Sequence, residues 1–224
     1  RAPADRGAPS EARLPRRYAG PRRRTARREG TGMPKGRLEA FTDAIIAIIM
    51  TVLVLELHEP TGGDFAALFA EWHRLLIYLV SFLMLAIYWN NHHHLFQAAR
   101  SVNGKVLWAN NFFILSLSLF PFVTSWMGDY FSDLAPQVTF GFMVMAADVM
   151  FFVVARNLQQ VEDGNDAVGV YFNRYWKSWA SVGANLVAIA LGVLVRPELV
   201  FVVNALMLVL WVVPERRIER AVRS

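Results

Sequence analysis

Residues 37–57, RLEAFTDAIIAIIMTVLVLEL, decide the fold, because a charged first turn runs directly into an apolar helix. About 20 apolar residues span the hydrocarbon core of a bilayer, so this run is long enough to cross a membrane. Its first turns also carry Arg37, Glu39, Thr42 and Asp43. Ionisable groups inside a membrane helix are costly, so they mark candidate functional positions.

Long apolar blocks continue through the rest of the 224-residue chain, of which 55% is hydrophobic. A soluble domain of this size would alternate polar and apolar faces, whereas uninterrupted apolar blocks are typical of a membrane protein. We therefore predict an all-α membrane protein with six transmembrane helices, in a domain covering residues 37–214. The predicted spans are residues 37–57, 75–95, 106–126, 138–154, 178–195 and 199–213. Pro121 predicts a kink in the third span.

Positive charge is concentrated at the amino-terminal end of the chain. The net charge is +5, yet residues 1–37 alone hold twelve Lys or Arg against three acids. Residues 1–36 lack apolar periodicity, so we predict a disordered basic arm, with Met33 as a candidate start of the natural protein. The positive-inside rule places this arm and a tail at residues 215–224 on the cytoplasmic side. The arm is interpreted as a solvated tail, and no nucleic-acid partner is expected.

A second polar cluster, WNNHHH at residues 89–94, ends the second predicted span. The first two spans run antiparallel, so this cluster lies at the same membrane face as Asp43. An imidazole or the Trp89 indole N–H is then placed to bond either Asp43 or a carbonyl group. Consecutive histidines point about 100° apart on a helix and lack the i,i+4 spacing of metal ligands, so no metal site is expected. His92 and His93 serve either a structural network or a proton relay with Asp43.

The apolar part of the first helix carries Ile48, Val52 and Leu55 at i, i+4 and i+7, with Thr51 beside them. Within one subunit this spacing describes an ordinary helix-packing stripe. If several copies surround a symmetry axis, the same residues form a hydrophobic constriction with a ring of threonine hydroxyls. Periodicity leaves both interpretations open.

Motifs typical of other channels and of enzymes are missing from the sequence. It has no TVGYG-like filter, no Arg-periodic voltage sensor, no Walker loop and no Gly-x-Ser-x-Gly elbow. It also has no cysteine, and no nucleophile is paired with a base. Neither an enzyme nor a cofactor is therefore expected.

The first helix resembles that of the transmembrane protein 175 family of potassium channels, with its Arg-x-x-x-Phe-Ser/Thr-Asp signature. The resemblance extends through three further blocks in the same order and covers nearly all of residues 35–214. These blocks are YWNNHH at residues 88–93, WANN at residues 108–111 and LFPF at residues 119–122. The resemblance implies six-helix subunits in a bacterial cell membrane. They would assemble as a homotetramer around a central pore that the first helix lines and potassium ions permeate.

The resemblance also implies roles for individual residues. Ile48 would form the narrowest hydrophobic layer of the pore, with Val52 and Leu55 above it. Thr51 would supply a layer of hydroxyl groups. The network that fixes the pore helix would comprise Arg37, Phe41, Thr42, Asp43, Trp89, His92 and His93. From its position alone, Glu56 would form an acidic ring at the outer mouth that concentrates cations.

We therefore expect a potassium-permeable cation channel without a pore-loop selectivity filter. The main alternative is a proton-coupled secondary transporter that uses Asp43 with His92 and His93 as a relay. A membrane scaffold that transports nothing is the third hypothesis. Channel flux follows the ion gradient linearly, whereas transporter flux saturates and requires a pH gradient.

Overall fold

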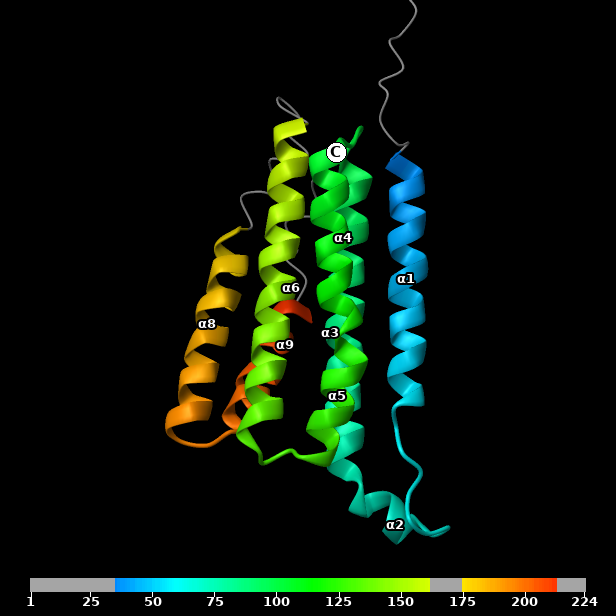
Figure 1. Cartoon of the computed structure of the whole chain (residues 1–224), viewed down its shortest axis with the longest axis vertical. Coiled ribbons are helices and arrows are strands. Elements are labelled where there is room, and N and C mark those ends of the chain that lie inside the picture. Colours follow the sequence, from blue (N-terminus) through cyan, green and yellow to red (C-terminus); the bar gives the residue numbers. More distant parts are fainter. Residues whose placement is uncertain (1–34, 162–174, 213–224) are drawn as a thin grey trace, which may run out of the picture. The chain divides into compact units, whose positions relative to one another are not determined.

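The computed structural model describes residues 35–161 and 175–212, and the regular structure in these ranges is entirely helical. The predicted tail and nearly all of the predicted basic arm lie outside the described residues. The helices are α1 (Lys35–Leu55), α2 (Phe65–Ala70), α3 (Trp72–Ala98), α4 (Gly104–Ser118), α5 (Phe120–Asp129), α6 (Leu134–Val161), α8 (Tyr175–Leu194) and α9 (Leu199–Val212) (Figure 1).

Four helical segments in the described ranges are long and apolar enough to cross a membrane. They are α1, α3, α6 and the combined segment Gly104–Asp129, which joins α4 and α5. Two shorter apolar helices, Trp179–Leu194 and Leu199–Val209, follow in α8 and α9. The predicted all-helical membrane architecture is confirmed. Each predicted span overlaps a helix, and that six segments cross the membrane stays a prediction.

The third predicted span is interrupted where α4 gives way to α5. α4 ends at Ser118, α5 begins at Phe120, and Pro121 lies in the first turn of α5. Proline has no backbone N–H and cannot continue the helical hydrogen-bond ladder, but a first turn tolerates it. The interruption at Leu119 therefore falls where Pro121 predicted a kink.

The core forms where α6 packs against α4, α5, α8 and α9, while α1 packs against α3, α4 and α5. Buried aromatic rings fill this core, and the Tyr88 ring meets Phe113 and Phe120 edge-on at 5.9 and 6.3 Å. Gly141 and Gly192 bring α6, α8 and α9 close together, because a Cβ at either position would collide with a facing side chain.

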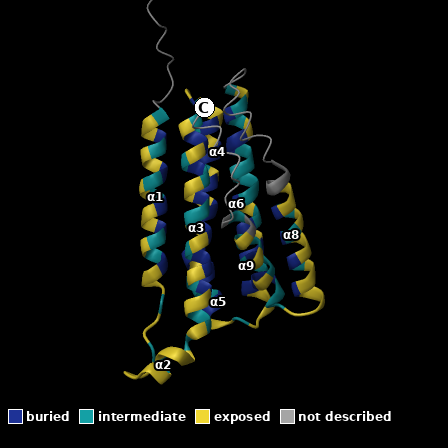
Figure 2. Ribbon diagram, turned by 180° about the vertical axis from the view of Figure 1, so that it is seen from behind, coloured by how far each residue is buried: buried dark blue, intermediate teal, exposed yellow. Residues whose placement is uncertain are grey.

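α1 turns only one side toward the rest of the bundle. Its buried residues recur every three or four positions and are Leu38, Thr42, Ile46, Ile49 and Leu53. This spacing places them on one helical stripe. Exposed residues follow the other side of α1 along its length (Figure 2).

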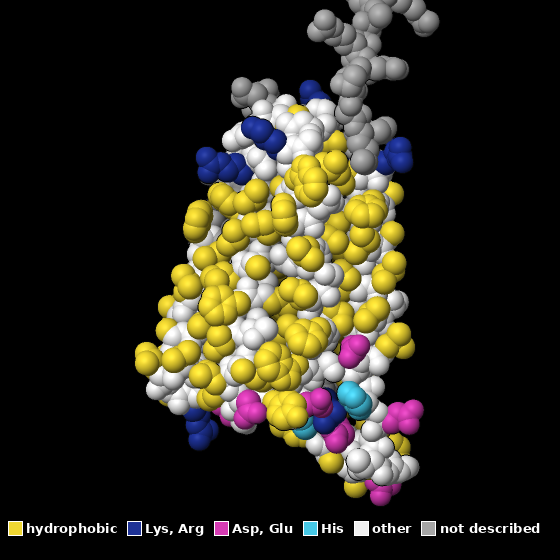
Figure 3. Space-filling view, viewed as in Figure 1, with side chains coloured by type: hydrophobic (Ala, Val, Ile, Leu, Met, Phe, Trp, Pro, Cys, Tyr) yellow, Lys and Arg dark blue, Asp and Glu magenta, His cyan; other side chains and the backbone are white. Residues whose placement is uncertain are grey.

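The charged side chains lie mainly toward the two ends of the bundle. Figure 3 shows a broad apolar face between Lys and Arg side chains at one end and Asp and Glu side chains toward the other, near α2. At the acidic end, Arg74 pairs with Glu71 at 2.8 Å and with Asp129 at 3.0 Å. Arg74 therefore joins the start of α3 to the end of α5.

Candidate functional site

A buried chain of hydrogen bonds connects α3, α4 and α1. His92 Nε2 donates to Asn110 Oδ1 at 2.8 Å, and Asn110 Nδ2 donates to Thr42 Oγ1 at 2.8 Å. The Thr42 hydroxyl donates in turn to the Leu38 carbonyl at 2.9 Å. His92, Asn110 and Thr42 all have 0% exposure. Because Asn110 and Thr42 each accept one bond and donate the next, the bonds run in one direction, polarise one another and fix the pairing of the three helices.

The His92 ring is held in place by flat stacking as well as by hydrogen bonding. Its centroid lies 4.2 Å from that of Phe96 and 5.8 Å from that of Phe113, with nearly parallel planes. Asn110, the middle member of the chain, was not assigned a role by the sequence analysis. The sequence did contain a clue to this role, because Asn110 places an amide inside the apolar third span, and a polar side chain at that depth needs a hydrogen-bond partner.

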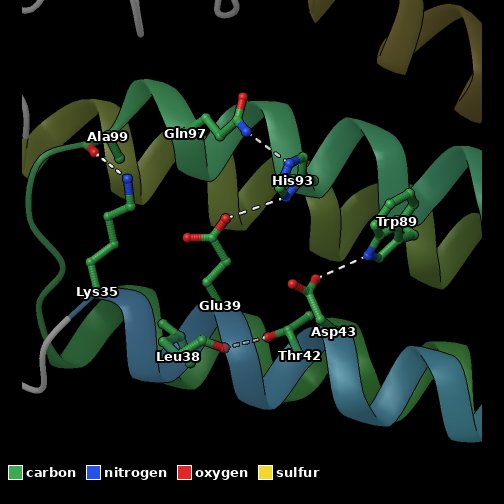
Figure 4. A network of polar contacts seen from close by, with 9 residues as sticks. All are labelled: Lys35, Leu38, Glu39, Thr42, Asp43, Trp89, His93, Gln97 and Ala99. Carbon is green, nitrogen blue, oxygen red and sulfur yellow. Dashed lines mark hydrogen bonds and ion pairs between the residues drawn. The ribbon is translucent and has the colours of Figure 1, made fainter.

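A second set of contacts joins α1 to α3 at their exposed edge (Figure 4). The Trp89 indole Nε1 donates to Asp43 Oδ1 at 3.0 Å, which is one of the pairings that the sequence left open. His93 stacks on Trp89 at 5.6 Å, and its Nδ1 lies 3.3 Å from Glu39 Oε1. Gln97 Nε2 donates to His93 Nε2 at 2.8 Å. These contacts order the flank of α1 that faces α3.

Lys35 closes the same edge at the start of α1. Its Nζ donates to the Ala99 carbonyl just beyond the end of α3, at 2.8 Å (Figure 4). This contact, like that of Glu39 with His93, was missed by the sequence analysis. A long side chain at a helix end has many reachable partners, so spacing along the chain does not select one.

Arg37 and Phe41 do not take part in either set of contacts. Both are exposed on α1, and Arg37 forms no hydrogen bond or ion pair with another described residue. Within the described part of the chain, Arg37 therefore makes none of the contacts of the network that the resemblance implied. The two residues do share a helix face, as their four-residue spacing predicted.

The polar contacts fix which residues of α1 remain uncovered. We call this surface the exposed α1 face, and it comprises Phe41, Ala44, Ile48, Thr51 and Leu55. Ile48 is 59% exposed and Leu55 is 79% exposed. The Thr51 hydroxyl donates to the Ile48 carbonyl at 2.7 Å, and this bond does not use the lone pairs of the hydroxyl oxygen. The residues of α1 that pack within the subunit are therefore the buried stripe described above, and they do not include Ile48, Thr51 or Leu55.

Val52 and Glu56 complete the predicted positions on α1. Val52 is half-buried and lies at the edge of the exposed α1 face rather than on it. Glu56 follows the end of α1 and is exposed. Among the described residues, no group of three or more His, Cys, Asp or Glu could hold a metal ion.

The apolar helices and their buried polar cross-links define an all-helical integral membrane protein. A family model described as "Endosomal/lysosomal potassium channel TMEM175" matches residues 37–121. A relative named as a potassium channel from Chryseobacterium sp. (strain P1-3) is 35% identical over 192 residues, which are 86% of this chain and 100% of the relative. The chain belongs to the TMEM175 family of ion channels.

Two further similarities concern the fold and a more distant relative. A crystal structure of a TMEM175 homolog from Chamaesiphon minutus, described as a lysosomal potassium-selective channel, matches with a TM-score of 0.68 at 23% identity. The match covers 79% of this chain and 95% of that one. The human endosomal/lysosomal proton channel TMEM175 is 35% identical over 80 residues, which are 30% of this chain and 16% of the human protein.

Proposed function

We propose that the protein is a potassium-permeable cation channel of a bacterial cell membrane. Six-helix subunits assemble as a homotetramer, and α1 from each subunit lines a central pore that has no pore-loop filter. The exposed α1 face is the observation that carries this proposal. The names of the bacterial relatives support the choice of potassium as the permeant ion.

The exposed α1 face suits a pore because of its composition and its fixed rotation. Two sets of polar contacts hold the opposite and flanking sides of α1 against α3 and α4. Ala44 and Ala47 are exposed beside Ile48, and small residues let helices approach one another closely. In a symmetric assembly, Ile48 and Leu55 become hydrophobic layers that gate by dewetting, and Thr51 becomes a ring of hydroxyl oxygens between them.

The charged ends of the subunit fit the same orientation. Glu56 lines a small pocket together with Arg74, at the acidic end of the bundle, where a ring of carboxylates concentrates cations at the outer mouth. Both termini lie on the cytoplasmic side, together with most of the Lys and Arg, in agreement with the positive-inside rule.

The contacts of the two histidines favour the channel over the proton-coupled transporter. A relay through Asp43, His92 and His93 requires a path between them. His92 bonds Asn110, whereas His93 meets Glu39 and Gln97, and no described hydrogen bond joins either imidazole to Asp43. The three groups therefore serve separate contacts rather than a relay.

Flux measurements on the purified protein in liposomes test the proposal. With opposed potassium and sodium gradients, we expect a current that is linear in the driving force and reverses near the potassium equilibrium potential. The current should not require a pH gradient. A conductance that saturates and needs a pH gradient would support the transporter, and an absence of flux would support the scaffold.

Two neighbouring isoleucines provide a matched pair of variants for the pore. Ile48→Asn places an amide in the proposed constriction, so we expect higher conductance and weaker potassium selectivity with normal protein yield. Ile49 is only 5% exposed and faces the bundle, so Ile49→Asn should lower the folded yield without raising conductance per molecule. Unchanged currents in Ile48→Asn would mean that Ile48 faces lipid or a neighbouring subunit. Sizing in detergent tests the homotetramer separately.

A further inference from the structure

A second polar site lies away from α1, in a cavity of about 50 Å³ between α3, α6, α8 and α9. No residue of α1 lines it, so it is separate from the proposed pore. Most of its wall is apolar. The residues that bring polar atoms to it are Tyr88, Asn91, Asp148, Ser181, Asn204 and Trp211.

Hydrogen bonds around this cavity engage the donors of Tyr88, Trp211 and Asn204. The Tyr88 hydroxyl donates to Asp148 Oδ1 at 2.6 Å, and the Trp211 indole donates to Ser181 Oγ at 3.0 Å. The Asn204 amide nitrogen donates to the Val200 carbonyl at 2.8 Å, and this bond does not use the Asn204 amide oxygen. The oxygen atoms of Asp148 and Ser181 each keep lone pairs beyond the bonds that they accept, and these lone pairs suit a positively charged ligand.

The charge of the site indicates a ligand with one positive charge. Among the described residues that line the cavity, Asp148 is the only acid, and none is a Lys, Arg or His. A carboxylate at membrane depth needs a compensating partner, and the neutral Tyr88 hydroxyl does not supply a charge. Divalent cations generally take several carboxylate ligands, and the described lining of this cavity offers one, so a monovalent cation fits better. No group of three His, Cys, Asp or Glu occurs in the described ranges.

The size of the cavity restricts the ligand further. A water molecule occupies roughly 10–15 Å³ on this kind of measure, so a cavity of about 50 Å³ holds about four waters or one ion with its remaining waters. An apolar cavity that accepts benzene measures about 150 Å³, which rules out an organic cation of that size here.

We propose that this cavity binds an alkali-metal cation, sodium or potassium, against the carboxylate of Asp148. The ion completes its shell with oxygen atoms of Asn91, Ser181 and Asn204 and with water. Because these residues come from α3, α8 and α9 while Asp148 comes from α6, the bound ion cross-links four helices. The site is thus a structural cation site that lies outside the conduction path.

Thermal unfolding of the full chain in detergent tests this site. Sodium or potassium chloride is compared with N-methyl-D-glucamine chloride at constant ionic strength. At about ten times the dissociation constant, the alkali cation should raise the Tm of the wild type by about 3–5 °C. Asp148→Asn keeps an oxygen that accepts from Tyr88 but removes the charge, so it should lose this shift.

Two control variants separate the cavity from other cation sites. Asp133→Asn removes an exposed loop carboxylate, and Thr51→Val removes a hydroxyl of the proposed pore, so both should keep the shift. An Asp148→Asn variant that also keeps the full shift would overturn the proposal. A wild type whose Tm responds to acidification but not to sodium or potassium would also overturn it, because the partner of Asp148 is then a proton.

A direct measurement decides the matter if Asp148→Asn does not fold. Wild-type crystals soaked in thallium(I), which replaces alkali cations, should show an anomalous peak beside the Asp148 carboxylate. Parallel soaks that add sodium or potassium in excess should reduce the peak, and the more effective competitor identifies the preferred ion. An empty, well-ordered cavity at saturating thallium(I) would refute the site.

Discussion

Replacing Asn110 by leucine should destabilise the protein far more than its single amide suggests. Asn110→Leu keeps a similar volume but removes both bonds that the amide makes, to His92 and to Thr42. Interhelical hydrogen bonds in membranes contribute about 0.6 kcal/mol on average and up to about 1.7 kcal/mol. A buried donor left without a partner costs a further 1–3 kcal/mol or so. His92 becomes such a group, and its Nδ1 already lacks a hydrogen-bond partner among the described residues.

The expected loss is therefore about 3 kcal/mol, or a fall in Tm of roughly 6–12 °C for a protein of this size. Tryptophan fluorescence during heating in detergent would measure it. The decisive comparison is the triple variant Thr42→Val, His92→Phe and Asn110→Leu, which replaces the whole chain by apolar groups of similar shape. It leaves no polar atom stranded, so it should recover to within about 1 kcal/mol of the wild type.

A triple variant less stable than Asn110→Leu alone would refute this reasoning. It would mean that the hydrogen bonds themselves, rather than the penalty for stranding a polar group, supply most of the stability. The exposed fraction of the three residues is 0%, so solvent cannot rescue the single variant. The liposome currents of the triple variant would then report whether the chain has a role beyond holding α1 in place.

Three further predictions test packing, the exposed edge and pH dependence. Gly192→Ala should cost about 1–3 kcal/mol, because its Cβ would collide with a valine methyl of α9, whereas Gly183→Ala meets open space and should be neutral or stabilising in thermal unfolding. Trp89→Phe removes the exposed bond to Asp43 and should cost about 0.5–1 kcal/mol in the same assay. Hydrogen bonding to its own backbone N–H lowers the pKa of Glu198, so its contribution to stability is present at neutral pH and is lost as the pH falls from about 4.3 through the lowered pKa. Glu198→Gln should remove that part of the acid dependence and lower the stability at pH 7 by about the amount that the wild type loses in acid.

The positions of the helices could be predicted from the sequence because hydropathy and chain length bound a membrane span tightly. The interruption before α5 was also predictable, since Pro121 cannot continue a hydrogen-bond ladder. α2 was not predicted, although Asp64 caps it by accepting from the Ala67 N–H at 2.8 Å. Its six residues are too few for a periodic signal. α6 begins at Leu134, earlier than the span predicted from residue 138, because helices extend beyond their apolar segments.

The candidate site was predictable only where local spacing determined it. The proximity of Trp89 to Asp43 followed from two antiparallel spans with polar residues at one end, whereas the choice of Trp89 over a histidine as the donor did not. Consecutive helical residues point about 100° apart, so the sequence indicated that His92 and His93 face different surroundings. It did not indicate which residues they contact. Which side chain meets His92 depends on the rotation of α4 relative to α3, and sequence spacing within one helix contains no information on that rotation. The pairing of Tyr88 with Asp148 was hidden for the same reason.

The two sets of contacts that hold α1 lie in different dielectric surroundings. Trp89 is 40% exposed, and the side chains of His93 and Glu39 are 31% and 19% exposed, so water and mobile ions reach this edge of α1. Added salt weakens such exposed charge contacts within a Debye length of about 10 Å at 0.1 M. The chain through Asn110 is dry and carries no net charge, so salt leaves it unchanged. Ionic strength would therefore loosen one edge of α1 while the inner attachment keeps its rotation.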